Sequence, residues 1–217
     1  MTRPVVLFSA GLDSAVLLAE AAAQPAGAQP VYISAGMAWE GTERAMAERF
    51  VAALGRGASL GPLASLWVDM RDVYPPTHWA VRGEAPAYDT PDSDVYIEGR
   101  NVVLLSKAAV FAARAKFSRI LIGTLACNPF PDASAAFFEA MSRALSIGLD
   151  APLAIEAPYA GLHKADVIRR GVALGVPFEL TLSCMQPVNG QHCGRCSKCR
   201  ERREAFVAAG LADPARC

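Results

Sequence analysis

The strongest indication of the fold is one stretch near the N-terminus, Val5-Val6-Leu7-Phe8-Ser9-Ala10-Gly11-Leu12-Asp13-Ser14. Its first four residues are a short apolar run, which predicts a buried strand. The small residues 9–11 predict a tight turn, and the alanine- and leucine-rich stretch from about Ser14 to Ala23 predicts a helix. A strand, a turn of small residues and a helix in this order are the start of a βαβ unit.

The same alternation continues along the chain. Further strands are predicted at 31–33, 66–68, 120–122 and 153–156, and further helices at 43–54, 101–116, 134–147 and 164–174. Such alternation implies right-handed crossovers and a parallel sheet with helices on both faces. We therefore expect an α/β fold with a doubly wound parallel sheet, in which ligands bind beyond the carboxyl ends of the strands. Residues 71–99, with four prolines, are predicted to form a long loop and a candidate lid over that edge.

The bulk composition limits the class of function. The chain has 217 residues, 53% of them hydrophobic, and its 21 basic and 21 acidic side chains give a formal net charge of zero. A neutral chain lacks the positive surface of a general nucleic-acid binder, so we expect a small-molecule substrate. No signal peptide or membrane segment is apparent, which predicts a cytoplasmic location. Six cysteines in that compartment indicate metal binding or catalysis rather than disulfides.

The turn at 9–14 has the composition of a phosphate-binding loop. Small residues let the backbone approach a ligand closely, and the N–H groups and dipole at a helix start favour an anion. The hydroxyls of Ser9 and Ser14 could donate to phosphate oxygens, and Asp13 suits a Mg²⁺ ion carried by a nucleotide. The alternative is a plain strand-to-helix turn in which Asp13 or Ser14 is the N-cap.

Four cysteines near the C-terminus have the spacing of a metal site. Cys193, Cys196 and Cys199 recur at three-residue intervals, and Cys184 can supply a fourth thiolate. Four thiolates in a tetrahedron make a closed structural Zn²⁺ site with no open position for chemistry. An iron–sulfur cluster and a redox-active CxxC pair are the alternatives. We therefore predict an α/β domain over residues 1–182 and a small zinc-binding subdomain over 183–217.

Other side chains near these cysteines have weaker patterns. The basic ones are Arg195, Lys198, Arg200, Arg202 and Arg203. They could contact RNA or a substrate phosphate, or form a solvated face that offsets thiolate charge. His192 could replace a thiolate, but a solvated loop position is the simpler expectation. Cys127, after the fourth predicted strand, could line the site or simply fill space.

Taken together, the motifs resemble those of a known family. Residues 9–14 are similar to the SGGxDS signature of the PP-loop ATP pyrophosphatases, with Ala10 in place of the first glycine. Alanine keeps the N–H donor, and its methyl costs little unless the position needs a positive φ. Within that class the chain resembles the QueC family of 7-cyano-7-deazaguanine synthases. The matching segments are GRN at 99–101, LLS at 104–106, KADVI at 164–168, LGVP at 174–177, SC at 183–184 and CGRCSKCR at 193–200.

The resemblance implies a reaction in queuosine biosynthesis. 7-Carboxy-7-deazaguanine, ATP and ammonia would give 7-cyano-7-deazaguanine. Adenylation would make the carboxylate a good electrophile, ammonia would give an amide, and a second activation would permit dehydration to the nitrile. Positioning and electrostatic stabilisation would carry most of this catalysis. The resemblance further implies ATP, Mg²⁺ and Zn²⁺ as cofactors, and a homodimer.

Roles for particular residues follow from the same resemblance. Asp13, Arg100 and Lys164 would be catalytic. Asp132 and Gly123 would bind the substrate. The ATP-binding set would be Ser9, Ala10, Gly11, Leu12, Asp13, Ser14 and Asn101. Without the resemblance, Lys164 would be taken for a solvated lysine.

The departures from the family lie where the acid should bind. The family's GYPDCRxEF-like stretch is here residues 129–137, in which Ala133, Ser134 and Ala136 replace its Cys, Arg and Glu. Its GQxH pattern is replaced by Gly36-Met37-Ala38-Trp39. Lost hydrogen-bonding partners change which substrate is accepted. The alternatives are therefore a QueC-like paralogue that adenylates a different acid or conjugates an activated deazapurine to an amine, and an inactive nucleotide- or RNA-binding module.

Overall fold

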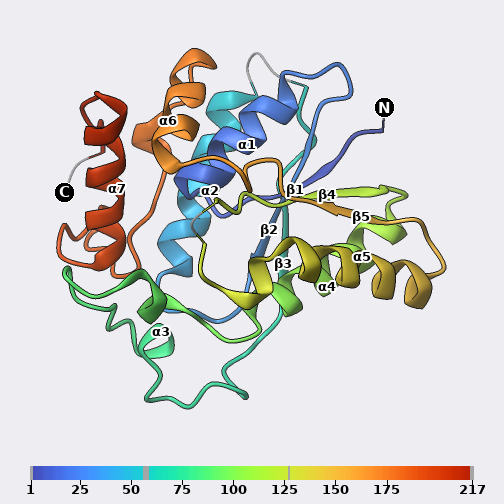
Figure 1. Ribbon diagram of the computed structural model, residues 1–217, viewed down its shortest axis with the longest axis horizontal. Coiled ribbons are helices and arrows are strands. Elements are labelled where there is room, and N and C mark those ends of the chain that lie inside the picture. The colour runs from blue at the N-terminus through green and yellow to red at the C-terminus, as the bar shows by residue number, and fades with distance from the viewer. Residues whose placement is uncertain (1, 56–58, 127, 216–217) are drawn as a thin grey trace.

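The fold is a five-stranded parallel sheet between two layers of helices (Figure 1). The computed structural model describes residues 2–55, 59–126 and 128–215, so Cys127 lies outside the described residues. The strands are β1 (Val5–Leu7), β2 (Gln29–Ser34), β3 (Ala64–Trp67), β4 (Arg119–Leu121) and β5 (Ala154–Glu156). They pair in the order β3-β2-β1-β4-β5, and each pair is parallel. The predicted sheet is confirmed.

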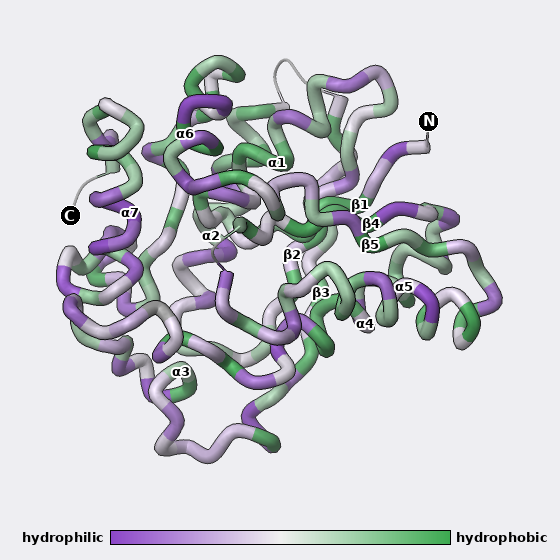
Figure 2. Tube along the Cα trace, viewed as in Figure 1, coloured by the Kyte–Doolittle hydropathy of each residue, from purple (hydrophilic) through white to green (hydrophobic). Residues whose placement is uncertain are grey.

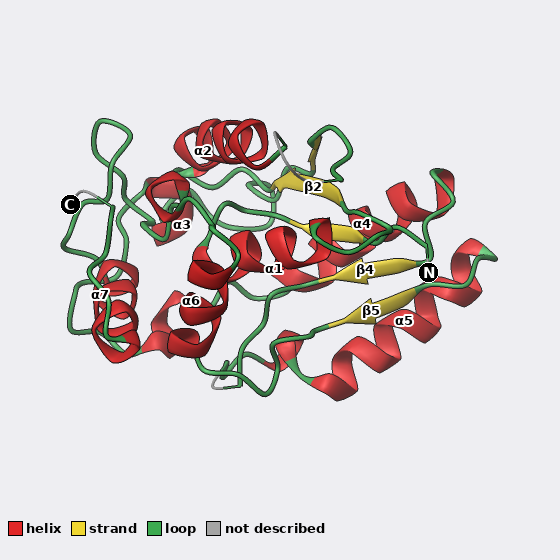
Figure 3. Ribbon diagram, turned by 90° about the horizontal axis from the view of Figure 1, so that it is seen from above, coloured by secondary structure: helices red, strands yellow, loops and turns green. Residues whose placement is uncertain are grey.

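Five long helices cover the sheet, as the sequence predicts. They are α1 (Leu12–Ala22), α2 (Glu40–Leu54), α4 (Arg100–Arg114), α5 (Ala135–Leu149) and α6 (Lys164–Ala173). Helices α1, α2 and α6 lie on one side of the sheet, and α4 and α5 lie on the other (Figures 1 and 3). Side chains along β1 alternate between the layers: Val5 packs with the α4 side and Val6 with the α1 side.

The C-terminal helix α7 (Ser197–Ala209) was not among the predicted helices. Its first turns are strongly hydrophilic (Figure 2), and its buried face is narrow, with Ala205 and Phe206 at its centre. Those two residues belong to the same apolar cluster as α1 and α6. The division of the chain at residue 182 stays a prediction.

The basic side chains of α7 do not share one solvated face. Arg202 is only 1% exposed and donates to Asp213, to the Thr181 hydroxyl and to the Phe178 carbonyl. Lys198 instead faces the sheet's carboxyl edge, as described below. The alternative of a solvated basic face is therefore wrong for these two residues.

The remaining elements are short. The segment 71–99 is mostly loop, as predicted, and contains α3 (Trp79–Arg82) and the 3₁₀ turn η1 (Asp92–Val95). Two further 3₁₀ turns are η2 (Pro131–Ala133) and η3 (Phe178–Leu180). Over the described residues, none of the helices has the length and apolar character needed to cross a membrane.

Candidate active site

A cavity opens where the strand order reverses. The chain leaves β1 toward β2 and β3 on one side and continues with β4 and β5 on the other, so the reversal lies between β1 and β4. Ligands of open α/β sheets bind at this point. The cavity has a volume of about 290 Å³. Its floor is apolar and formed by Leu7, Val31, Ile33, Leu104 and Ile122; its polar lining includes Ser9, Asp13, Ser14, Glu43, Arg100, Asn101, Thr124, Asp132 and Lys198.

The turn between β1 and α1 is closed by its own hydroxyl groups. The Gly11 N–H donates to Ser9 Oγ over 3.4 Å, and the Ser9 N–H donates to Ser14 Oγ over 3.3 Å. Ser14 Oγ donates to the Gly11 carbonyl over 3.1 Å. Ser9, Gly11 and Ser14 all line the cavity, so the positive end of α1 lies against it. This is the arrangement expected of a phosphate-binding turn.

Ala10 has a backbone conformation that favours glycine. Its φ is 57°, and its carbonyl accepts the Leu182 N–H over 2.8 Å. An alanine methyl is costly at a position with positive φ, so Ala10 is strained here. A left-handed non-glycine residue costs about 1–2 kcal/mol, which the surrounding structure must offset. Ala10 and Leu12 do not line the cavity with the other residues of this turn.

Gly123 lets the end of β4 approach this turn closely. A Cβ atom at Gly123 would lie 3.2 Å from the backbone carbon of Asp13 and 3.2 Å from the backbone nitrogen of Ser14. Both neighbours are backbone atoms, which cannot rotate away. The glycine therefore sets how near β4 can lie to the start of α1.

A chain of ion pairs links Asp13 to the C-terminal helix. Lys164 Nζ lies 3.4 Å from Asp13 Oδ2 and also donates to Glu201 Oε1. Glu201 Oε2 in turn accepts from Lys198 Nζ over 2.5 Å. All four side chains are mostly buried, with 18–23% of each exposed. Lys164 is thus not the solvated lysine that its sequence position alone would indicate.

Burial and charge have opposite effects on these groups. Burial raises the pKa of Asp13, and the nearby Lys164 ammonium only partly opposes this. Burial would lower the pKa of Lys164, but the carboxylates of Asp13 and Glu201 outweigh it and raise that pKa. Burial would raise the pKa of Glu201, but Lys164 and Lys198 lower it to about 2. Glu201 is therefore a fixed anion that holds two ammonium groups at the site.

Arg100 and Glu43 face the same cavity from α4 and α2. Glu43 accepts a hydrogen bond from the Tyr32 hydroxyl over 3.0 Å. Burial raises the pKa of Glu43 to about 7, against the opposing effect of the Arg100 charge. The Arg100 guanidinium lies 5.9 Å from the centre of the Trp39 ring, which in turn stacks on Trp79. The tryptophan at a position of the family's GQxH pattern therefore orients Arg100.

Asn101 and Asp132 form a pair at the start of α4. The Asn101 N–H donates to Asp132 Oδ2 over 3.0 Å, and its side-chain amide donates to the Asp132 carbonyl over 3.0 Å. Asp132 is buried, and burial raises its pKa against these hydrogen bonds. Both residues line the cavity, where Asp132 fixes the first turn of α4 that also carries Arg100.

The other departures from the family lie outside the lining. Ser134 is the N-cap of α5, where its hydroxyl accepts the Phe137 N–H. Ser134 and Ala136 are exposed, and Ala133 packs against the apolar cluster under α4 and α5. None of these three positions lines either described cavity at this edge of the sheet.

Three buried polar atoms at the cavity have no hydrogen-bond partner: Asp13 Oδ1, Arg100 Nε and Thr124 Oγ1. Among the described residues, only one other buried side-chain polar atom is in this condition. An unpaired buried group costs roughly 1–3 kcal/mol, so three of them gathered at one cavity indicate a ligand that pairs with them.

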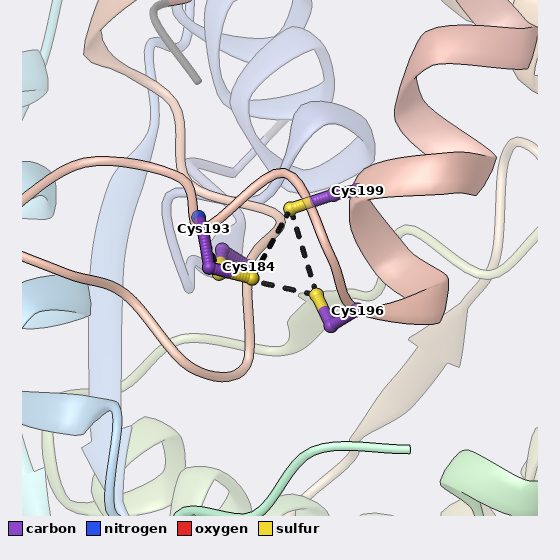
Figure 4. A group of neighbouring side chains, drawn as sticks. All are labelled: Cys184, Cys193, Cys196 and Cys199. Carbon is purple, nitrogen blue, oxygen red and sulfur yellow. Dashed lines mark hydrogen bonds between the residues drawn. The ribbon is translucent and has the colours of Figure 1, made fainter. Parts of the chain in front are cut away.

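The four predicted cysteines converge on one point (Figure 4). Their sulfur atoms all lie within 4.8 Å of one another. The separations are 3.5 Å for Cys196 and Cys199, 3.9 Å for Cys184 and Cys196, and 4.0 Å for Cys193 and Cys199. Four sulfurs about 2.3 Å from a tetrahedral zinc ion lie about 3.8 Å apart, so the thiols fit Zn²⁺.

His192 has a different role from either expectation. It is buried rather than solvated, and its Nε2 accepts the Ser183 N–H over 3.0 Å. Burial lowers the pKa of His192 to about 4, which keeps the ring neutral and able to accept this bond.

Sequence reasoning missed three polar side chains of the site: Thr124, which follows β4, and the two carboxylates Glu43 and Glu201. Both follow a helix start at the carboxyl edge of the sheet: Glu43 lies in the first turn of α2, and Glu201 follows the CxxC of the cysteine cluster. Carboxylates at such starts are usually taken for helix-dipole partners. Glu201 lies close to the predicted ligand Cys199, which is a signal, whereas no predicted site residue lies close to Glu43 in the sequence.

A doubly wound parallel sheet with this turn at its reversal point defines an open α/β protein of the class whose ligand site lies between β1 and β4. The sequence profile described as "Queuosine biosynthesis protein QueC" matches residues 3–210. The chain belongs to the QueC family.

Relatives at the sequence level span nearly the whole chain. The 7-cyano-7-deazaguanine synthase of Anaeromyxobacter dehalogenans is 36% identical and covers 98% of this chain and 94% of its own length. The enzyme of the same name from an Azoarcus species is 38% identical, with coverage of 100% and 97%. A solved structure from Methanocaldococcus jannaschii, described as a predicted subunit of tRNA methyltransferase, is 13% identical with a TM-score of 0.53. It covers 98% of this chain and 90% of its own, and it shows likeness of fold alone.

Proposed function

We propose that the protein is an ATP-dependent C–N ligase that adenylates 7-carboxy-7-deazaguanine and converts it with ammonia to 7-cyano-7-deazaguanine. The three unpaired polar atoms at the reversal point of the sheet, on Asp13, Arg100 and Thr124, carry the proposal. They include acceptors and donors, as an anionic nucleotide with its metal ion requires. The names of the relatives support 7-cyano-7-deazaguanine as the product, and the family resemblance supports the acid.

The cavity offers separate places for the parts of ATP. The apolar floor formed by side chains of β1, β2 and α4 and by Ile122 suits a nucleobase. Ser9, Gly11 and Ser14 would donate to the phosphates at the start of α1. Asp13 Oδ1, buried and unpaired, would be a ligand of Mg²⁺, and the bound ion would neutralise phosphate charge.

The proposed reaction has two activations. A carboxylate oxygen of the acid attacks the α-phosphorus of ATP, and pyrophosphate leaves. Ammonia adds to the acyl carbon, and AMP leaves with that oxygen, which gives the amide and releases a proton. The amide oxygen then attacks the α-phosphorus of a second ATP, and pyrophosphate leaves. Loss of AMP, which takes that oxygen with it, and of two protons then gives the nitrile. Lys164 and Arg100 would stabilise the negative charge that gathers on phosphate in each activation.

The supporting parts of the proposal are Zn²⁺, ammonia and a homodimer. Zn²⁺ at the four cysteines would be structural, since four thiolates leave no open position. Ammonia as the nitrogen donor and the homodimer are supported by the family resemblance alone. Equilibrium sedimentation tests the dimer, and a single monomer mass at micromolar concentration would contradict it.

The test is release of AMP and pyrophosphate from Mg-ATP, with and without 7-carboxy-7-deazaguanine and ammonia. We expect AMP formation that requires the acid and a nitrile product in the mass spectrum. Asp13→Ala should lose AMP formation by at least about a hundredfold, because charge stabilisation at the phosphates is lost. ATP binding without turnover of this acid would contradict the proposed substrate and favour the paralogue that uses a different acid or amine.

A further inference from the structure

A second recess adjoins the cavity at the same edge of the sheet. It has a volume of about 300 Å³ and is lined by Leu125, Pro129, Leu162, His163, Lys164 and Glu201. The two spaces share five lining residues: Asp13, Gly123, Asn128, Phe130 and Lys198. The shared residues mark where the cavity and the recess meet.

A bisubstrate transfer requires its two substrates to meet at one atom. With the nucleotide in the cavity at the reversal point, a second substrate in the adjoining recess can reach the nucleotide only at the shared lining. In an adenylation the meeting atom is the α-phosphorus. Of the five shared residues, Lys198 alone is a cation.

We infer that Lys198 binds the α-phosphate of the adenylate and is a catalytic residue of the reaction, an inference that rests on the proposed ATP site. Its side chain is 21% exposed, so it is partly desolvated, and an ammonium there attracts a phosphate more strongly than one in water. The resemblance assigned no role to this lysine.

The cysteine cluster and Glu201 position Lys198. The residue lies in the first turn of α7, between Cys196 and Cys199, and both thiols are buried. A metal ion at these thiols would fix the backbone on each side of the lysine. Glu201, one turn later, accepts from Lys198 Nζ over 2.5 Å and also binds Lys164. Glu201 is therefore a positioning residue that keeps Lys198 at the shared lining and Lys164 in the recess beside Asp13.

The test compares Lys198→Met with Lys198→Arg, and uses Lys107→Met, an exposed lysine of α4, as the matched control. We expect Lys198→Met to weaken AMP binding about tenfold and leave adenosine binding within twofold, because only AMP carries the α-phosphate. Lys198→Arg should recover most of the AMP affinity. Zinc content should stay at that of the wild type in all three variants.

Turnover gives the second readout. With wild-type enzyme active on 7-carboxy-7-deazaguanine, Lys198→Met should lower kcat about a hundredfold, as loss of one charge-stabilising group does. Unchanged AMP affinity in Lys198→Met would overturn the inference, and so would equal losses for AMP and adenosine or a loss of bound zinc. If the wild type does not turn over this acid, the proposed substrate fails, while the AMP and adenosine affinities still decide the role of Lys198.

Discussion

At the residue scale, the site depends on side chains that are charged and partly or fully buried. Asp13, Lys164, Glu201 and Lys198 pair with one another and so offset the cost of leaving water. The cost of burying the Glu43 carboxylate is offset less completely, by a hydrogen bond from the Tyr32 hydroxyl and by the more distant charge of Arg100. Its ionisation should therefore be visible in the stability of the protein.

Glu43→Gln should change how stability depends on pH. Burial raises the pKa of Glu43 from 4.5 to about 7, so the folded protein binds this proton more tightly than the unfolded chain. The contribution of Glu43 to stability is thus present below pH 4.5 and is lost as the pH rises to about 7. Between pH 5 and pH 8, the free energy of unfolding of the variant, measured with urea, should rise relative to that of the wild type by up to about 3 kcal/mol. Glu48→Gln, at an exposed position of α2, is the control for removing a carboxylate from this helix. A pH-independent difference between Glu43→Gln and the wild type would refute the assignment.

Gly123→Ala should weaken ATP binding. The added Cβ would lie 3.2 Å from two backbone atoms of the turn between β1 and α1, which must then shift by a few tenths of an ångström. Such a shift should raise the Kd for ATP about tenfold, since small displacements of positioning groups are costly. Calorimetric titration gives the value. In Gly148→Ala, the control in α5, the new methyl meets nothing within 4 Å and ATP affinity should not change. Equal affinities in the two variants would show that close approach at Gly123 is not required.

At the element scale, α7 connects the cysteine cluster to the site. It begins at Ser197, with Cys196 as its N-cap, and packs on α6, while its first two turns supply Lys198 and Glu201. The buried Arg202 attaches its middle to the Phe178 carbonyl and the Thr181 hydroxyl. The proposed zinc would thus determine the position of catalytic groups without touching a substrate.

Cys199→Ser should therefore reduce metal content, stability and activity together. Loss of a structural zinc ligand removes several kcal/mol of folding free energy, which lowers the Tm on the order of 10 °C in a chain of this size. Elemental analysis and calorimetry measure the two effects. Ser197→Ala is the matched control, because Ser197 is equally buried beside the cluster and its hydroxyl has no partner. We expect that variant to keep its metal and its Tm. Full zinc occupancy in Cys199→Ser would contradict the four-thiolate site, and iron in the wild type would contradict zinc.

The sequence predicts the regular elements better than the site. Short apolar strands and long helices of clear period locate all five strands and the five helices that cover them. Hydrophobic periodicity does not predict helix α7, because the apolar face of this helix is narrow and basic side chains surround it. Glu201 was missed with it, since nothing local shows that a carboxylate of α7 meets Lys164 of α6. The left-handed backbone of Ala10 likewise depends on the surrounding packing and not on its own type.

At the scale of the whole molecule, the order of the strands brings distant segments to one edge. The turn after β1, the end of β4, the start of α4 and the first turn of α7 all face the cavity at the strand reversal, although they span most of the chain. The adjoining recess adds the start of α6. This architecture suits a reaction that joins a nucleotide to a second small molecule.

In the proposed reaction, a carboxylate oxygen of the acid attacks the α-phosphorus of ATP. The most direct measurement uses 7-carboxy-7-deazaguanine labelled with ¹⁸O in both carboxylate oxygens, with Mg-ATP and ammonia, and mass spectrometry of the AMP. Each activation transfers one of the two carboxylate oxygens to phosphorus. We therefore expect one ¹⁸O atom in each AMP molecule, whether it comes from the first activation or the second. AMP free of ¹⁸O, formed while the nitrile accumulates, would contradict adenylation of the acid.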